Sequence, residues 1–247
     1  MLDVEQSSGV TLVRFRHGKV NALDLELLRA LTAVMRDLDP AGAAVLTGSG
    51  AAFSAGVDLN RIVAGGPAYA QEFLPALSDA LLAVFDHPGP VVAAVDGHAI
   101  AGGCVIAAAG DVRLMSAGRI GLAELSVGVP FPTAALEIMR HAIGPAASHL
   151  VLTAGLLDPA QAQAIGLVHE VVAPDALLDA AIARAGQLAR VPADVYSFSK
   201  RQLQRPARDR MAAHSGDDKA VAAMWSSGRT RDGIAAYLDT LRQRPRS

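Results

Sequence analysis

Short apolar runs alternate with helical patterns over the first half of this chain. The runs are rich in β-branched residues and bounded by turn residues, which is typical of strands. They cover residues 9–15, 43–50, 90–97 and 111–117. Between them, leucines at helical spacing follow Asp24, a residue suited to cap a helix, and further helices are expected over residues 68–85 and from Gly102. Such alternation produces parallel βαβ units with right-handed crossovers, so the sequence predicts an α/β fold.

The second half of the chain is mostly helical. Beyond Pro132 the pattern predicts one further strand and several helices. The strand is expected over residues 168–172, and the helices over 176–190, 193–205, 217–225 and 231–243. Composition changes near residue 190. We therefore expect an α/β core over residues 1–190 and a helical C-terminal region over residues 191–247.

Composition excludes several classes of protein. With 51% hydrophobic and 19% charged residues among 247, the chain can bury a large core. A formal net charge of −2 and only 4% aromatic residues provide neither a basic face nor a stacking platform, so no nucleic-acid partner is expected. Basic residues gather over residues 197–210 and near the end of the chain. They are explained either as solvated helix faces or as local contacts with an anion such as a phosphate.

The sequence contains few signals for targeting or metal binding. Cys104 is the only cysteine, which excludes an intramolecular disulfide and fits a reducing compartment. The first residues lack a signal-peptide pattern and no apolar run reaches the length of about 18 residues that a membrane span needs, so a cytoplasmic protein without a membrane partner is expected. The seven histidines lack metal-ligand spacing, and no metal site is expected. GxSxG, GxGxxG and P-loop motifs are absent from the sequence.

Two glycine-containing loops, Ser54–Asp58 and Ala101–Cys104, each follow a buried strand. In a parallel sheet such loops share the edge at which ligands bind. Glycine lets the backbone approach a ligand closely, and the second loop opens a helix, whose first N–H groups have no helical partner. Two N–H groups from these loops could hold one developing oxyanion, although two ordinary turns would have the same sequence.

Glu124 lies in the stretch "RIGLAELSVGVPFP", which is otherwise almost apolar. Burying a carboxyl group without a partner is costly, and desolvation raises its pKa toward neutrality. A general acid or base needs such a pKa. The alternative is an ordinary exposed acid at a strand edge. Asp58 and Asp96 lie near the glycine loops and can be explained as turn caps.

Five segments, taken in their order and spacing, carry a resemblance to a known family. They are "GKVNALDLELL", "AAFSAGVDL", "AIAGGCVIAAAGDVRLM", "IGLAELSVGVPFP" and "AQAIGLVHEVV". The set resembles the crotonase (enoyl-CoA hydratase/isomerase) superfamily, over about residues 9–240. The resemblance implies a crotonase-like spiral of ββα units, with residues 191–247 as a helical trimerisation region. A homotrimer or a homohexamer is therefore expected.

The resemblance also implies a substrate and a set of site residues. The substrate would be an acyl-CoA thioester, with no separate cofactor because coenzyme A is part of the substrate. Val57 and Gly102 would supply the two N–H groups of an oxyanion hole, and Glu124 would be the acid/base. The residues expected to contact coenzyme A are Ser54, Ala55, Val57, Asp58, Lys19 and Lys200. The first four would bend around the adenine through their backbone, and the two lysines would meet phosphates.

One position separates two reactions within this superfamily. Its hydratases carry two glutamates, and the place of the first is taken here by Val105, whereas the second matches Glu124. One carboxylate beside an oxyanion hole suits the shift of a double bond from 3-enoyl-CoA to 2-enoyl-CoA. Glu124 would move the proton from C2 to C4, and Val105 would belong to an apolar wall that excludes water. The pattern looks most like the Δ3,Δ2-enoyl-CoA isomerases of fatty-acid β-oxidation. A hydratase or other crotonase-type lyase, and a non-catalytic acyl-CoA-binding protein, are the alternatives.

Overall fold

The larger of two β-sheets has six strands in the computed structural model, which describes the backbone of residues 1–243 and the side chains of residues 1–240. In spatial order they are β1 (Leu2–Ser7), β2 (Val10–Phe15), β3 (Ala43–Thr47), β5 (Val91–Val95), β7 (Val112–Met115) and β10 (Glu170–Val171). The β1–β2 hairpin is antiparallel and all the other pairs are parallel. The predicted α/β class is confirmed.

A smaller sheet contains the strands β4 (Ala52–Ser54), β6 (His98–Ile100), β8 (Ile120–Gly121) and β9 (Leu156–Leu157). The chain visits the two sheets in turn. Each of β3, β5 and β7 in the large sheet is followed by β4, β6 or β8 in the small one, and then by a helix. These helices are α2 (Leu59–Phe85), α3 (Gly102–Ala109) and α4 (Glu124–Val127). The molecule is thus the spiral of ββα units implied by the resemblance, whereas the hydrophobic pattern alone missed the second strand of each unit.

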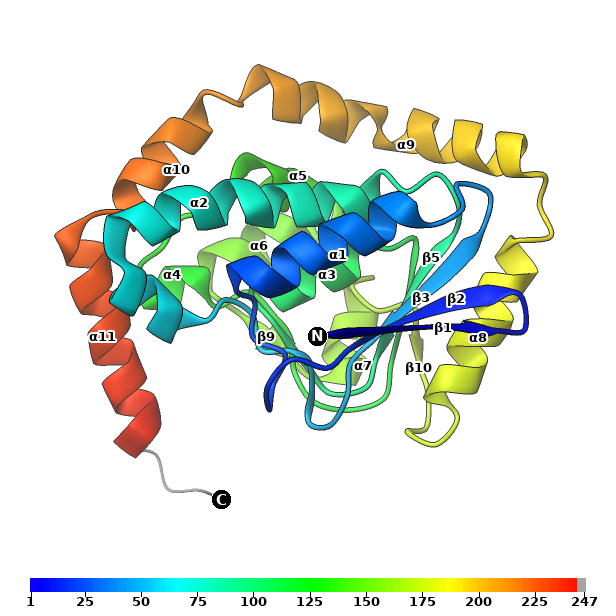
Figure 1. Cartoon of the computed structure of the whole chain (residues 1–247), viewed down its shortest axis with the longest axis horizontal. Coiled ribbons are helices and arrows are strands. Elements are labelled where there is room, and N and C mark those ends of the chain that lie inside the picture. The colour runs from blue at the N-terminus through cyan, green and yellow to red at the C-terminus, as the bar shows by residue number, and fades with distance from the viewer. Residues whose placement is uncertain (244–247) are drawn as a thin grey trace.

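Helices cover both faces of the large sheet, because side chains alternate between the faces along each buried strand. In β5, Val91, Ala93 and Val95 belong to the core beneath α1 (Leu25–Asp37), α2 and α3. Val92 and Ala94 point the other way, toward α8 (Leu177–Leu188). Figure 1 shows α1, α2 and α5 (Thr133–Ile143) running side by side above the sheet. Two shorter helices follow α5, namely α6 (Ala146–Leu152) and α7 (Pro159–Ala164).

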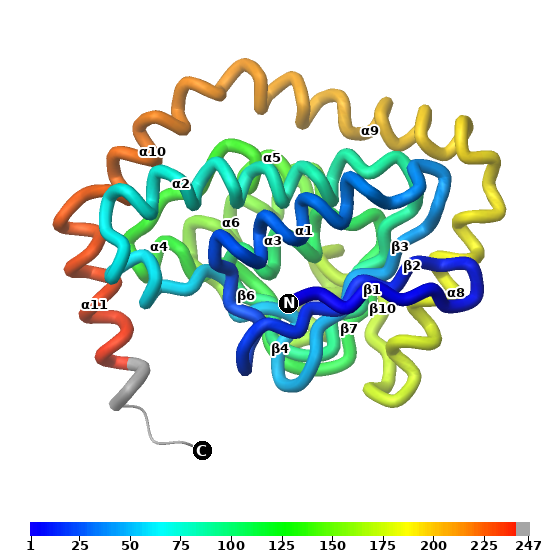
Figure 2. The backbone as a smooth tube through the Cα atoms, in the orientation of Figure 1, coloured from blue at the N-terminus to red at the C-terminus, as the bar shows by residue number. Residues whose placement is uncertain are grey.

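The last three helices wrap around this core. They are α9 (Ala193–Ala213), α10 (Asp217–Trp225) and α11 (Gly228–Gln243). In Figures 1 and 2, α9 crosses above α5, and α10 and α11 then descend beside α2 and α4. Gln204 of α9 donates to the Phe85 carbonyl at 2.6 Å, and Arg210 pairs with the buried Glu137 at 2.5 Å. In residues 1–243, no helix is long and apolar enough to cross a membrane.

The first strand and the start of α2 also differ from the sequence expectation. β1 was not expected, because the stretch "LDVEQS" is polar and lies at the edge of the sheet, where its side chains are mostly exposed. Helix α2 begins at Leu59 and not near residue 68. Two helical segments are joined there by a kink at Gly66, whose φ of 61° and ψ of −154° are readily available only to glycine.

Candidate active site

One cavity, of about 280 Å3, joins the two glycine loops to the last helices of the chain. We call it the Glu124 cavity. It is lined by Val20, Ala22, Ala55, Val57, Asp58, Leu59, Asn60, Ile100, Ala101, Ala123, Glu124, Val127, Val129, Trp225, Tyr237 and Leu238. Val20 and Asn60 are exposed, whereas Val129 and Trp225 are buried. The cavity therefore opens at the first pair and closes at the second.

Glu124 is the first residue of α4 and is only 8% exposed. Its Oε2 atom is buried and has no hydrogen-bond partner among the described residues. Burial raises the pKa of this carboxyl to about 8, and the backbone N–H groups of Glu124 and Ala123 oppose that shift. A carboxyl with this pKa can both accept and return a proton near neutral pH, so the acid predicted from sequence has the properties of a general base.

The two glycine loops are packed against each other. Gly56 has a φ of 81°, and a Cβ atom there would lie 2.6 Å from the carbonyl oxygen of Ile100. A Cβ atom on Gly103 would lie 2.5 Å from the carbonyl oxygen of Ser54. Because both contacts leave no room for a side chain, the glycines bring the end of β4 directly against the start of α3.

Backbone hydrogen bonds fix Val57 without using its N–H group. Leu23 donates to the Gly56 carbonyl at 2.8 Å and accepts from the Asp58 N–H at 2.9 Å. The N–H of Val57 itself has no acceptor among the described residues, and Val57 lines the Glu124 cavity. This arrangement leaves one donor available to a bound ligand.

The second donor lies at the start of α3. Ala101 precedes the helix with a φ of 53° and a ψ of −125°, a strained conformation for a residue with a Cβ atom. Gly102 follows it, and its N–H has no acceptor among residues 1–243. Ala101 lines the Glu124 cavity, and the buried Gly102 follows it in the chain. Of the predicted site residues, Val57 and Glu124 therefore line the same cavity, and Gly102 is adjacent in sequence to a third lining residue.

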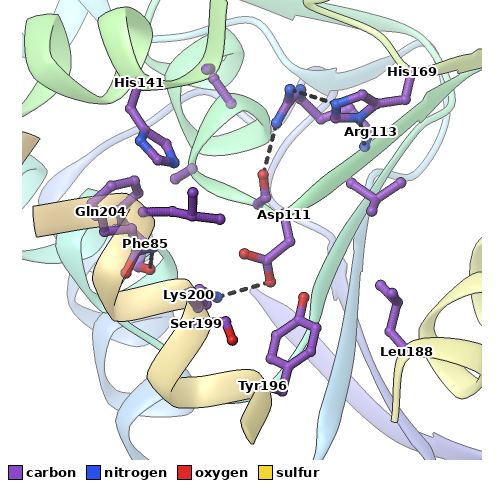
Figure 3. Close-up of a pocket in the computed structure, with 16 residues that line it drawn as sticks. Phe85, Asp111, Arg113, His141, His169, Leu188, Tyr196, Ser199, Lys200 and Gln204 are labelled. Atoms are coloured by element: carbon purple, nitrogen blue, oxygen red, sulfur yellow. Dashed lines mark hydrogen bonds and ion pairs between the residues drawn. The ribbon is translucent and has the colours of Figure 1, made fainter. Parts of the chain in front are cut away.

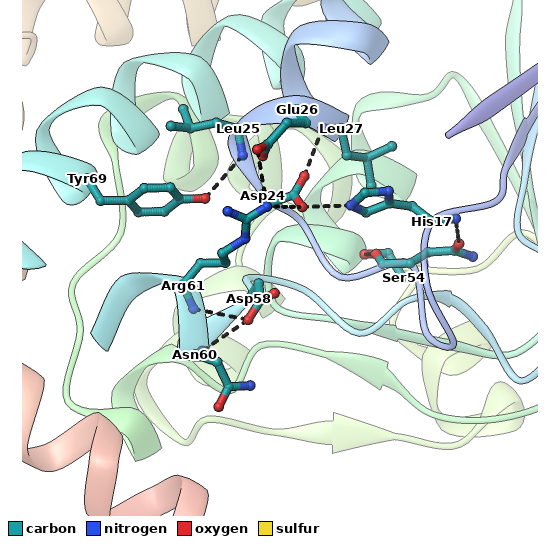
Figure 4. A network of polar contacts seen from close by, with 11 residues as sticks. His17, Asp24, Leu25, Glu26, Leu27, Ser54, Asp58, Asn60, Arg61 and Tyr69 are labelled. Carbon is teal, nitrogen blue, oxygen red and sulfur yellow. Dashed lines mark hydrogen bonds and ion pairs between the residues drawn. The ribbon is translucent and has the colours of Figure 1, made fainter. Parts of the chain in front are cut away.

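A polar network holds the entrance of the cavity (Figure 4). The Asp58 carboxylate accepts from the backbone N–H groups of Asn60 and Arg61 and so caps α2. The Arg61 guanidinium pairs with Glu26 at 3.1 Å. Asp24 caps α1 and contacts His17 at 2.6 Å. These contacts tie the first turns of α1 and α2 together.

Five of the six residues predicted to contact coenzyme A lie at or near the Glu124 cavity, and Lys200 lies elsewhere. Ala55, Val57 and Asp58 line the Glu124 cavity. Ser54 is buried beneath them, where its hydroxyl donates to the Asn21 carbonyl at 2.7 Å. Lys19 is exposed and directly precedes Val20 at the cavity entrance.

Lys200 is not part of this group. Its side chain is 7% exposed and lines a second cavity, of about 390 Å3, beside α9 (Figure 3). The ammonium donates to the Gly89 carbonyl at 3.2 Å and pairs with Asp111 at 2.8 Å. Lys200 therefore fastens α9 to the core within this chain, which differs from the phosphate contact that the sequence suggested.

Val105 and Cys104 also lie outside the Glu124 cavity wall. Val105 is buried in the apolar core, so the wall expected from it is formed instead by other apolar residues, such as Val127 and Val129. Burial raises the pKa of the Cys104 thiol, and the nearby charge of Glu124 raises it further. A neutral buried thiol is a packing residue, as the sequence indicated.

Sequence reasoning missed most of the lining residues, including three from the C-terminal helices. Trp225, Tyr237 and Leu238 come from α10 and α11, about a hundred residues beyond Glu124, and they complete the cavity from the same chain. Trp225 is the only tryptophan of the chain and ends a short amphipathic helix. A single tryptophan in this position indicates a buried side chain, but the sequence does not indicate which cavity the side chain lines.

The ββα spiral with its helical C-terminal region defines a protein of the crotonase type, and here Val57 and the buried carboxyl of Glu124 line one cavity. Comparison with known proteins agrees. The family model described as enoyl-CoA hydratase/isomerase matches residues 5–244. The chain belongs to the enoyl-CoA hydratase/isomerase family, whose substrates are acyl-CoA thioesters, and it is an enzyme of that family.

Some of the similar proteins are named as isomerases and others as hydratases. The chain is 25% identical to human mitochondrial enoyl-CoA delta isomerase 1, over 98% of this chain and 83% of that protein. The crystal structure of the human mitochondrial Δ3-Δ2-enoyl-CoA isomerase superposes with a TM-score of 0.91 over 98% of both chains, at 25% identity. A probable enoyl-CoA hydratase of Rhizobium meliloti is 30% identical over 95% of this chain and 93% of its own length.

Proposed function

We propose that this enzyme moves the double bond of a 3-enoyl-CoA to the 2-position. The observation that carries the proposal is the single unpartnered carboxyl oxygen of Glu124 in a cavity whose inner wall is apolar. The thioester oxygen would accept hydrogen bonds from the Val57 and Gly102 N–H groups. The acyl chain would lie beside Glu124, between the glycine loops and α4.

The proposed reaction needs one base and no water. The Glu124 carboxylate takes the proton from C2, and the electrons of that C–H bond spread over the thioester and the alkene as a dienolate. Negative charge on the thioester oxygen is stabilised by the two N–H donors. The protonated Glu124 then gives the proton to C4, and the double bond rests between C2 and C3. The Glu124 carboxylate is regenerated, and the product is an isomer of the substrate with no atom gained or lost.

Hydration is the second candidate, because a relative at 30% identity is named a probable hydratase. Adding water would require Glu124 to activate the water without a second glutamate, since Val105 stands in that place and lies in the core. Asp58 is the other carboxylate on the cavity wall, and it is engaged in capping α2 at the entrance. These contacts favour the isomerase.

The family resemblance alone supports the proposed oligomeric state, metabolic role and location of the enzyme. We propose a homotrimer or homohexamer that acts in fatty-acid β-oxidation in the cytoplasm. Coenzyme A enters as part of the substrate, and no separate cofactor takes part in the proposed steps.

The test replaces Glu124 by glutamine, which keeps the shape of the side chain and removes the base. Conversion of 3-hexenoyl-CoA to 2-hexenoyl-CoA should fall by about 10²–10⁴-fold, because general base catalysis contributes that much. Binding of hexanoyl-CoA, measured by calorimetry, should survive.

The matched control is Glu72→Gln, which changes an exposed glutamate of α2 paired only with Arg29. It should retain full isomerase activity. Water addition to crotonyl-CoA is measured alongside in the unmodified enzyme. A hydration rate well above the isomerisation rate would replace the proposal by the hydratase, and acyl-CoA binding without any turnover would replace it by a non-catalytic binding protein.

A further inference from the structure

The inner end of the Glu124 cavity is closed by apolar side chains from two distant parts of the chain. Val127 and Val129 follow Glu124 on and after α4, and Trp225 comes from the end of α10. All three are buried, whereas Val20 and Asn60 at the opposite end are exposed. A ligand that enters beside Val20 therefore meets Trp225 as it goes deeper.

Trp225 is held firmly in this position. Its indole Nε1 donates to the Pro130 carbonyl at 2.8 Å. Its ring stacks on Phe73 with centroids 6.3 Å apart, and Phe73 stacks in turn on Tyr69 at 6.0 Å. An indole fixed by both a hydrogen bond and ring stacking cannot turn aside without losing these contacts. It forms a rigid end wall.

The arrangement of the two N–H donors sets the direction of the acyl chain. Val57 and Ala101, the residue before Gly102, line the cavity between its exposed residues Val20 and Asn60 and its buried end at Trp225. A thioester held by the two donors would direct its coenzyme A moiety to the exposed end and its acyl chain inward past Glu124. The cavity volume of about 280 Å3 lies just below the usual span of ligand pockets, about 300–1,000 Å3. A cavity of this size, closed by a fixed indole, limits the length of the acyl chain that it can hold.

We propose that Trp225 sets the longest acyl chain that the enzyme accepts among acyl-CoA thioesters. This inference rests on the proposed function, because it assumes an acyl-CoA in the Glu124 cavity. Each methylene that reaches the apolar end of the cavity gains affinity by burial. A longer chain than the cavity can hold must displace the indole or pull the thioester away from the two N–H donors, and it therefore binds less tightly.

The experiment measures the dissociation constants of saturated acyl-CoA thioesters, from butanoyl to dodecanoyl, by calorimetry. In the unmodified enzyme the affinity should rise about fourfold per buried methylene up to a limiting length, and then fall. Trp225→Ala and Trp225→Leu should move that limit to the next longer chains. The leucine variant keeps an apolar side chain at this position, so it still tests the proposal if the alanine variant does not fold.

Val221→Ala is the matched control. Val221 is a buried residue one turn earlier in α10, and it lines a different cavity, beside Leu74 and Pro132. It should loosen the packing of α10 without changing the limiting chain length. Circular dichroism establishes that each variant is folded.

The outcomes separate the two proposals. A longer limit in both Trp225 variants, with the control unchanged, supports the role of Trp225, whatever reaction is catalysed. The same limit in all folded variants, or an equal change in Val221→Ala, overturns it. If binding shows the expected limit but no 3-enoyl-CoA is isomerised, the isomerase proposal fails alone. If no acyl-CoA binds, both fail.

Discussion

The burial of the Glu124 carboxyl group lowers the stability of the folded protein. A carboxyl group in an apolar cavity loses its hydration, and Oε2 receives no hydrogen bond in exchange from the described residues. Such a group is retained when a reaction uses it, since burial also brings its pKa near 8, where proton transfer in either direction is easy. Function and stability therefore make opposite demands on this side chain.

The first residue-scale prediction concerns the pH dependence of activity. Because the base must be ionised to take a proton, kcat/KM should rise about tenfold per pH unit below a pKa of about 8 and level off above it. The measurement is kcat/KM for 3-hexenoyl-CoA between pH 6 and pH 9. A flat profile over this range would show that Glu124 is not the titrating base.

The second concerns stability, and its sign follows from the same pKa. Folding raises the pKa of Glu124 from about 4.5 to about 8, so between these values the folded state holds a proton that the unfolded state has lost. Stability therefore falls as pH rises through this window. Glu124→Gln should be more stable than the unmodified enzyme at pH 8, by on the order of a few kcal/mol, and equal to it near pH 4.

Urea unfolding of both proteins at pH 4, 6 and 8 measures this difference. The gain of the glutamine variant should grow with pH. A variant that is less stable at pH 8 would mean that Glu124 has a favourable partner in the folded protein, and the pKa argument would then fail.

At the scale of elements, the site depends on the close approach of two loops. The β4–α2 and β6–α3 loops meet at Gly56, where the nearest backbone oxygen would be only 2.6 Å from an added Cβ. Both N–H donors belong to these loops. Their separation is therefore set by glycine backbone packing and not by any side chain.

Gly56→Ala should accordingly damage catalysis more than folding. The Cβ must push Ile100 and Ala101 away, and the positive φ adds strain of about 1–3 kcal/mol. A displacement of about 1 Å can cost about 10²-fold in rate, so kcat should fall by that order. Gly186→Ala in α8, where the nearest atom is 4.0 Å away, is the control and should keep full activity. Equal rates in all three proteins would exclude the loop contact as the determinant of the site.

Sequence patterns predicted the elements whose signal is local. The buried strands β2, β3, β5 and β7 and the helices α1 and α3 follow from apolar runs, spacing and caps within their own residues. β4, β6 and β8 are only two or three residues long. An alternation of apolar and polar residues cannot be recognised over so few positions, so the sequence pattern did not predict these strands. The repeat of two strands per unit came from family resemblance and not from the pattern.

The site shows the same division. The two glycine loops and Glu124 drew attention through their own residues, whereas the choice of Val57 and Gly102 as the donors came from the family resemblance. Trp225 was not identified, because its place depends on the path of α9 and α10 around the core. Lys200 was assigned by its charge, and the half-buried Asp111 that pairs with it is 89 positions away in sequence. Long-range contacts of this kind have no local signature.

At the scale of the whole molecule, polar contacts attach the C-terminal helices to the core. Lys200 and Gln204 join α9 to the segment between α2 and β5 and to the end of α2, and Arg210 joins it to the buried Glu137. These contacts hold α9, and with it the path that carries α10 and α11 to the Glu124 cavity. The trimerisation role expected for this region stays a prediction.

The two lysines expected at coenzyme A can be separated by their variants. Lys200→Met leaves Asp111 without its partner in a mostly buried place, so the free energy of unfolding should fall by roughly 3 kcal/mol, with KM for 3-hexenoyl-CoA unchanged. Lys19→Met should leave stability unchanged and raise KM by up to about fivefold, since an exposed ion pair is worth ~1 kcal/mol. Urea unfolding and steady-state kinetics measure both. If Lys200→Met instead raised KM and Lys19→Met lowered the free energy of unfolding, Lys200 would be the phosphate contact after all.

The closing of the Glu124 cavity by α10 and α11 has a consequence for the chain while it is being made. Val57, Gly102 and Glu124 all emerge from the ribosome long before Trp225 and Tyr237. Until α10 and α11 fold back, the cavity lacks the side chains that they contribute, so Glu124 faces water and an acyl chain would have no apolar end to bind. On the proposed function, the growing chain would therefore stay inactive until these two helices have folded.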